Sequence, residues 1–108
     1  MITTFNLTPI DCDRVGYWSY CDRINIQALL LNFKLPHLFD VTFVFPMPNS
    51  WDKEKKSIMD GQIHEVGPNI NQLYKGFLDA FFEKDNCIYY ASPTKIWGFS
   101  GKIIVKSA

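Results

Sequence analysis

Two asparagines and a lysine stand at the start of a predicted helix, in the stretch GPNINQLYKG at residues 67–76. Asn69 and Asn71 flank the apolar Ile70, so both side chains point away from the core, and Lys75 lies one turn after Asn71 on the same face. If the segment is extended, the two amides project on one side and could share a ligand. If the helix starts here, either asparagine predicts an N-cap, which is the commoner role, and Lys75 is a solvated lysine.

The other groups that could do chemistry are scattered. His64 and His37 have no second histidine or cysteine at metal-ligand spacing, so we expect both to be surface histidines. A small basic cluster broken by acids, WDKEKK, is typical of a solvated helix face and contains Lys53, Lys55 and Lys56. The sequence has no phosphate-binding glycine-rich loop, no nucleophile elbow and no Cys/His catalytic signature.

Length and composition indicate one folded domain over residues 1–108. Apolar residues make up 47% of the chain and aromatic residues 16%, which is enough to build a core. The 11 basic and 11 acidic residues balance, and the only arginines are Arg14 and Arg23, whereas a protein that depends on phosphate contacts is usually basic. A local basic patch on this neutral chain would still be compatible with nucleic acid.

Cysteine spacing and hydropathy predict a cytoplasmic protein. Cys12, Cys21 and Cys87 form no CxxC pair, so we expect reduced thiols. The N-terminus lacks the basic and apolar regions of a signal peptide, and the longest apolar run, ALLL, is too short to span a membrane. We therefore expect no membrane partner.

Hydrophobic periodicity predicts an α+β domain. The clearest helix covers 70–81, where apolar residues recur at helical spacing: Ile70, Leu73, Tyr74, Phe77, Leu78 and Phe81. A second helix is expected over 17–33, with an apolar side formed by Ile24, Ile26, Leu29, Leu30 and Phe33. Strands are expected at 2–8, 40–46, 87–91 and 102–107, and a short capped helix after Ser50. The predicted order is β-α-β-(short α)-α-β-β, a mixed β-sheet with two main helices packed on it.

Beyond these local signals, residues 47–105 resemble the RusA family of Holliday-junction resolvases. In phage and prophage members this region typically reads MPxSWSxKKRxxMxGxPHxxKPDIDNLxKxxLDAL, followed by a DD pair, TKxW and a glycine before the last strand. The chain keeps this pattern in register at Met47, Pro48, Ser50, Trp51, Lys55, Lys56, Met59, Gly61, His64, Pro68, Ile70, Leu73, Lys75, Leu78, Asp79, Ala80, Thr94, Lys95, Trp97 and Gly101. The N-terminal elements match in order, so the resemblance covers essentially the whole chain.

The resemblance implies a homodimer that binds four-way DNA junctions in recombination and repair and cuts two strands symmetrically with magnesium. Family members use three aspartates and a nearby lysine, and these positions fall here on Asn69, Asn71, Asn86 and Lys75. Replacing three carboxylates by amides changes the local charge from about −3 to 0. Because magnesium prefers anionic oxygens, we expect no metal cofactor, and any metal would have to be held by the three asparagines.

Three functions stay open at this point. The first is a catalytically inactive RusA-like homodimer of phage or prophage type that binds branched DNA through Lys53, Lys55, Lys56, Lys75 and Lys95. The second is a protein-interaction module, such as a phage-encoded inhibitor of a host nucleic-acid or defence machine, which the neutral charge and scarce arginine favour. The third is an active magnesium-dependent junction resolvase with a rearranged metal site, in which Glu83 and Asp85 supply the missing charge.

Overall fold

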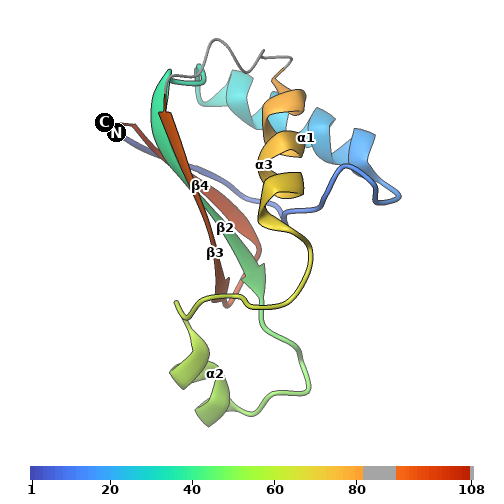
Figure 1. Cartoon of the computed structure of the whole chain (residues 1–108), viewed down its shortest axis with the longest axis vertical. Coiled ribbons are helices and arrows are strands. Elements are labelled where there is room, and N and C mark those ends of the chain that lie inside the picture. Colours follow the sequence, from blue (N-terminus) through green and yellow to red (C-terminus); the bar gives the residue numbers. More distant parts are fainter. Residues whose placement is uncertain (82–89, 108) are drawn as a thin grey trace.

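The computed structural model of the chain describes residues 1–81 and 90–107, which fold into a four-stranded sheet and three helices (Figure 1). The strands are β1 (Ile2–Phe5), β2 (Leu38–Pro46), β3 (Tyr90–Gly98) and β4 (Lys102–Ser107). The helices are α1 (Tyr17–Leu30), α2 (Lys53–Met59) and α3 (Ile70–Ala80). These elements follow the predicted order, and no helix in the described part of the chain is long and apolar enough to cross a membrane.

The sheet mixes parallel and antiparallel strands, in the order β1-β4-β2-β3. β4 pairs antiparallel with β1 and with β2, whereas β2 pairs in parallel with β3. A parallel pair needs a long connection because its strands cannot be joined by a tight turn, and α2 and α3 lie in that connection. The predicted α+β class with a mixed sheet is confirmed.

α1 and α3 lie on the same face of the sheet (Figure 1), and the hydrophobic core lies beneath them. Alternate residues of β2 turn to this face and are buried: Phe39, Val41, Phe43 and Phe45. From the stripe predicted for α3, the buried residues are Leu73, Phe77 and Leu78. The Phe77 ring packs edge-on against Phe5 and Phe43, with centroids 6.2 and 6.1 Å away. The predicted amphipathic character of α3 is therefore confirmed.

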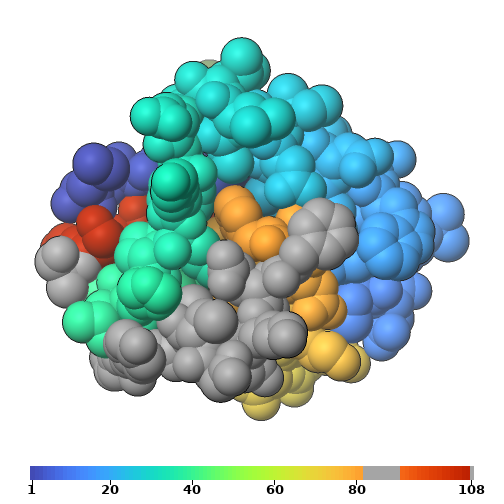
Figure 2. Space-filling model, turned by 90° about the horizontal axis from the view of Figure 1, so that it is seen from above, coloured from blue at the N-terminus to red at the C-terminus, as the bar shows by residue number. Residues whose placement is uncertain are grey.

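α1 turns a different face to the core from the one predicted. Its buried residues are Tyr17, Tyr20, Cys21, Ile24 and Ala28. The Tyr17 hydroxyl helps to fix this rotation, because it donates to the backbone oxygen of Gly76 in α3 at 2.7 Å. The predicted apolar side is therefore wrong for three residues that are exposed: Ile26, Leu29 and Leu30. Figure 2 shows α1, in blue to cyan, along the outside of the molecule.

The end of α1 differs from the sequence prediction, whereas the start of α2 agrees with it. α1 stops at Leu30 rather than at residue 33, because Asn32 adopts a left-handed conformation with φ of 52°, a common way for a helix to end. The short capped helix expected after Ser50 is α2, and its cap is Asp52, whose carboxylate accepts a hydrogen bond from the Lys55 backbone N–H at 2.8 Å.

Two strands also have different limits. β1 stops at Phe5 instead of residue 8. The strand predicted at 87–91 is described from Tyr90 and continues to Gly98, while residues 87–89 lie outside the described ranges. Pro93 sits within this longer strand, which is possible because β3 is at the edge of the sheet, where a missing N–H leaves no ladder bond unmade.

Candidate functional site

Asn69 is the N-cap of α3. Its side-chain oxygen accepts a hydrogen bond from the Asn71 backbone N–H at 2.8 Å, and its backbone oxygen accepts one from Leu73 at 3.1 Å. The capping alternative is confirmed, and Asn71 already lies in the first helical turn. Lys75, one turn further on, is exposed. Asn86, the third asparagine of the predicted site, lies outside the described residues.

A hollow of about 560 Å³ opens beside this helix start, and we call it the Asn69 hollow. Its lining consists of residues 63–70 and 93–95. The Lys95 ammonium donates to the backbone oxygens of Val66 and Pro68, at 2.6 and 2.7 Å. Lys95 therefore fixes the loop that leads to Asn69, and its partial burial lowers its pKa below the usual lysine value.

His64 is buried, so its predicted place on the surface is wrong, whereas His37 is exposed as predicted. The residue is 4% exposed, and its imidazole stacks on the Phe45 ring and lies tilted against Trp97, with centroids 4.4 and 4.3 Å away. Its Nδ1 is buried and has no hydrogen-bond partner in the described part of the chain. Burial, and then the positive charge of Lys95, lower the pKa of His64, which favours the neutral ring and an aromatic packing role.

Residues 61–64 lie along the edge of β3 like a short extra strand. The Gly61 N–H donates to the Trp97 oxygen and the Trp97 N–H donates to the Gln62 oxygen, both at 2.9 Å. The His64 N–H donates to the Lys95 oxygen at 3.1 Å. β3 therefore positions the whole segment before Asn69, through its backbone as well as its side chains.

The predicted basic cluster lies on a separate element from Lys75. α2 carries Lys53, Lys55 and Lys56, and it lies away from α1 and α3 (Figure 1). The Lys55 ammonium lies 4.3 Å above the ring of Trp51, in a cation–π contact. Trp51 in turn packs against Trp97, with ring centroids 5.0 Å apart, which attaches the base of α2 to β3.

The described donors do not fit magnesium. Over residues 1–81 and 90–107, no three histidine, cysteine, aspartate or glutamate side chains group closely enough to hold a metal ion. The acidic residue that lines the Asn69 hollow is Glu65, and the oxygen of Asn69 is already used in capping. Magnesium needs carboxylates beside such amide oxygens. Glu83 and Asp85, the predicted replacement acids, lie outside the described residues.

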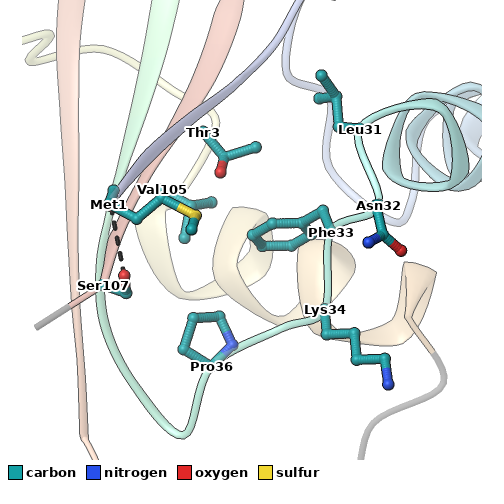
Figure 3. A pocket seen from close by; sticks show the side chains of 9 residues that line it. All are labelled: Met1, Thr3, Leu31, Asn32, Phe33, Lys34, Pro36, Val105 and Ser107. Carbon is teal, nitrogen blue, oxygen red and sulfur yellow. Dashed lines mark hydrogen bonds between the residues drawn. The ribbon is translucent and has the colours of Figure 1, made fainter.

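A further hollow, of about 510 Å³, lies between β1, β4 and the segment after α1 (Figure 3). Apolar side chains converge on it, including Phe33, Val105 and Met1. The polar side chains of Asn32 and Lys34 point away from its centre. None of its lining residues is acidic.

Several residues that carry the resemblance have structural roles around the Asn69 loop. The rings of Trp97 and His64 pack together, Lys95 donates to the backbone of the loop before Asn69, and the N–H of the buried Met47 donates to the Gly98 oxygen at 3.0 Å. These contacts hold residues 47–69 against β3. Compared with known proteins, the chain matches no protein-family model and no curated protein.

Proposed function

We propose that the chain is a RusA-like homodimeric protein that binds branched DNA without cleaving it. The observation that carries this proposal is the position of Asn69, which caps α3 at the rim of the Asn69 hollow. An asparagine engaged with a backbone N–H is neutral and poorly placed to hold magnesium. The start of α3 is the positive end of a helix dipole, and a DNA phosphate is an anion that it would stabilise.

The charges around the hollow support a phosphate ligand. With amides in place of carboxylates, repulsion of the DNA backbone is removed. Lys75 is exposed, and Lys95 has three ammonium protons, of which the two backbone oxygens use two. The exposed Lys53 and Lys55 on α2 would extend the contact along the DNA.

The test is a binding titration of a labelled four-way junction and a linear duplex of equal length, in the presence of a chelator and at several salt concentrations. We expect tighter binding of the junction and a steep loss of affinity with salt. Lys75→Gln should weaken binding and lower the salt slope by about one. Lys106→Gln, which removes another exposed lysine, in β4, is the matched control and should bind like the unaltered protein. Equal affinity for junction and duplex would contradict the proposal.

Restoring the three carboxylates distinguishes loss of the metal site from loss of the DNA-binding surface. The variant combines Asn69→Asp, Asn71→Asp and Asn86→Asp and is assayed for junction cleavage in magnesium or manganese. We expect cleavage by this variant and none by the unaltered chain, because only the variant supplies anionic metal ligands. Cleavage by the unaltered chain would instead support the nuclease with a rearranged metal site.

A second candidate function, protein interaction, is favoured by the outer face of α1. Trp18, Leu29 and Leu30 are 75%, 82% and 81% exposed on this helix. Exposed apolar surface of this kind is typical of a protein-binding face. Changing Leu29 and Leu30 together to aspartate should abolish capture of a host protein if this function is correct. Under the DNA-binding proposal the same variant keeps its junction affinity, and sedimentation shows whether α1 contributes to the proposed homodimer.

A further inference from the structure

The largest group of exposed apolar side chains in the described chain lies along α1. Over residues 1–81 and 90–107, thirteen large apolar residues are exposed, and six of them lie between residues 15 and 31: Val15, Trp18, Ile26, Leu29, Leu30 and Leu31. Single exposed apolar side chains are ordinary on a protein surface. A group of them along one helix is typical of a surface that another molecule covers.

Within α1 these side chains form one stripe. Trp18, Ile26 and Leu29 are spaced at i, i+8 and i+11, so they lie on one side of the helix, and Asp22 lies between them. Leu30 follows Ile26 by one turn. The residues that α1 buries in the core lie on the opposite side. We call this exposed stripe the α1 face.

The α1 face and its two ends are large enough for a dimer interface. Burial of one such side chain removes on the order of 80 Å² of apolar surface, so the six together offer roughly 500 Å². An interface of standard size covers about 800 Å² on each partner, of which about 60% is apolar. The apolar area that this helix exposes therefore matches what one side of such an interface needs.

The charges in the α1 face complement their own copies. Asp22 and Arg23 are both exposed, and neither forms an ion pair with a residue that the structure describes. If two chains meet about a two-fold axis near Arg23, their α1 helices run antiparallel, and two carboxylates and two guanidinium groups come together with no net charge. Trp18 of one copy then lies between Ile26 and Leu30 of the other, because these two bracket the position that is as far beyond the axis as Trp18 is before it.

The two ends of the α1 face also fit each other. Val15 is fully exposed just before α1, and Leu31 follows the helix and lines the hollow shown in Figure 3. Each of them lies eight residues from Arg23, so the same two-fold axis brings Val15 of one copy to Leu31 of the other. An apolar side chain of each copy is thereby placed at the apolar hollow of its partner.

We propose that the α1 face binds the α1 face of a second copy of this chain, as an antiparallel helix pair with its two-fold axis near Arg23. This inference rests on the homodimer of the proposed function and names the surface on which the two copies meet. A membrane surface suits the α1 face less well, because an interfacial helix carries several lysines or arginines and α1 contains Arg23 alone. The Asn69 hollow is built from one copy and shares no residue with the α1 face.

Sedimentation velocity of the full chain without DNA, between about 1 and about 100 µM, is the first test. We expect a monomer–dimer equilibrium in which the dimer predominates at the highest concentration. Ile26→Asp should weaken the dimer by at least about tenfold, because it places an unpaired charge in the interface. Ile58→Asp changes another exposed isoleucine, on α2, and as the matched control it should change the dissociation constant by less than about twofold. Circular dichroism checks that both variants are folded.

Charge reversal at the axis tests the two-fold arrangement itself. Asp22→Arg puts four positive charges at the axis and Arg23→Asp puts four negative charges there, so each variant alone should dimerise at least about tenfold more weakly. An equimolar mixture of the two variants should dimerise like the unaltered chain, because each copy then meets opposite charges. Glu54→Arg, which reverses an exposed charge on α2, is the control and should leave dimerisation unchanged.

The outcomes distinguish this interface from DNA binding. If Ile26→Asp dissociates the dimer, Ile58→Asp does not, and the chain binds junction and duplex equally, the α1 interface is supported and the DNA-binding function fails. A chain that prefers the junction but stays monomeric at about 100 µM contradicts the α1 interface alone. Equal losses in Ile26→Asp and Ile58→Asp, or a mixture of the charge variants no more dimeric than each variant by itself, would also overturn it. A monomeric chain whose α1 face binds a host protein would show that its partner is not a second copy.

Discussion

Two regions of the molecule are held together in different ways. The body, which is the sheet with α1 and α3, has a core in which Phe5, Phe43 and Phe77 are completely buried. The arm, residues 47–69, includes α2, a helix with no buried residue. It is attached to β3 mainly through Trp97 and Lys95. The body is therefore stabilised by a large apolar area and should unfold as one unit, whereas the arm depends on a few contacts and should be released separately.

Phe77→Ala is expected to have the largest effect, because it opens a cavity where the rings of Phe5, Phe43 and Phe81 meet. The free energy of unfolding should fall by about 3–5 kcal/mol. Urea unfolding followed by circular dichroism measures this loss. Phe99→Ala removes an exposed ring and is the matched control, expected to change stability by less than about 0.5 kcal/mol. Equal losses in the two variants would contradict the described core.

Trp97→Ala should affect the arm more than the body. The half-buried indole packs against Trp51 and His64, so its removal should cost about 2 kcal/mol, less than loss of a core phenylalanine. Hydrogen exchange should become faster at the Gly61 and His64 amides, which donate to β3, and stay slow at Val41 in the centre of the sheet. Trp18→Ala, which removes an exposed indole, should leave all of these rates unchanged. Uniform acceleration in Trp97→Ala would show that arm and body are one cooperative unit.

The body could be largely predicted from the sequence because local periodicity determines it. The spacing in α3 and the alternation in β2 mark their buried faces without knowledge of any partner. α1 is the exception, because apolar residues occur on two of its faces. Its rotation follows from contacts such as that of Tyr17 with Gly76, which join distant parts of the chain. No local pattern contains that information.

The arm and the candidate site are harder to predict, because their contacts also join distant parts of the chain. The sequence marked Asn69 as a candidate cap, since capping depends on the next two residues. The sequence does not indicate that His64 is buried, because the polar residues around His64 are typical of a surface loop. The two rings that enclose the imidazole belong to β2 and β3, which are distant in the sequence. The contacts of Lys95 with the backbone oxygens of Val66 and Pro68 likewise depend on the fold, because these residues are far from it in the sequence.

Asn69→Ala tests the point at which the arm meets the body. Loss of the cap should lower the free energy of unfolding by about 1 kcal/mol. Asn71→Ala is the matched control, because Asn71 contributes its backbone N–H, which alanine keeps, and stability should change by less than about 0.5 kcal/mol. Asn69→Asp should retain full stability, since a carboxylate also caps and suits the positive helix end. Equal losses at the two asparagines would show that Asn69 does not cap α3.

His64 should produce the smallest effect, a dependence of stability on pH. Burial, and secondly Lys95, lower its pKa from the ordinary value of 6.5. Above that value the ring is neutral in both the folded and the unfolded chain, so it adds no pH dependence to the stability. As the pH falls from about 7 to about 5, the unfolded chain binds a proton more readily than the folded chain. The free energy of unfolding therefore decreases over this range. His64→Phe keeps a ring between Phe45 and Trp97 but cannot titrate, so its unfolding free energy should fall less steeply over this range. If the slopes of His64→Phe and the unaltered protein coincide, the histidine is not held neutral by the contacts that attach the arm.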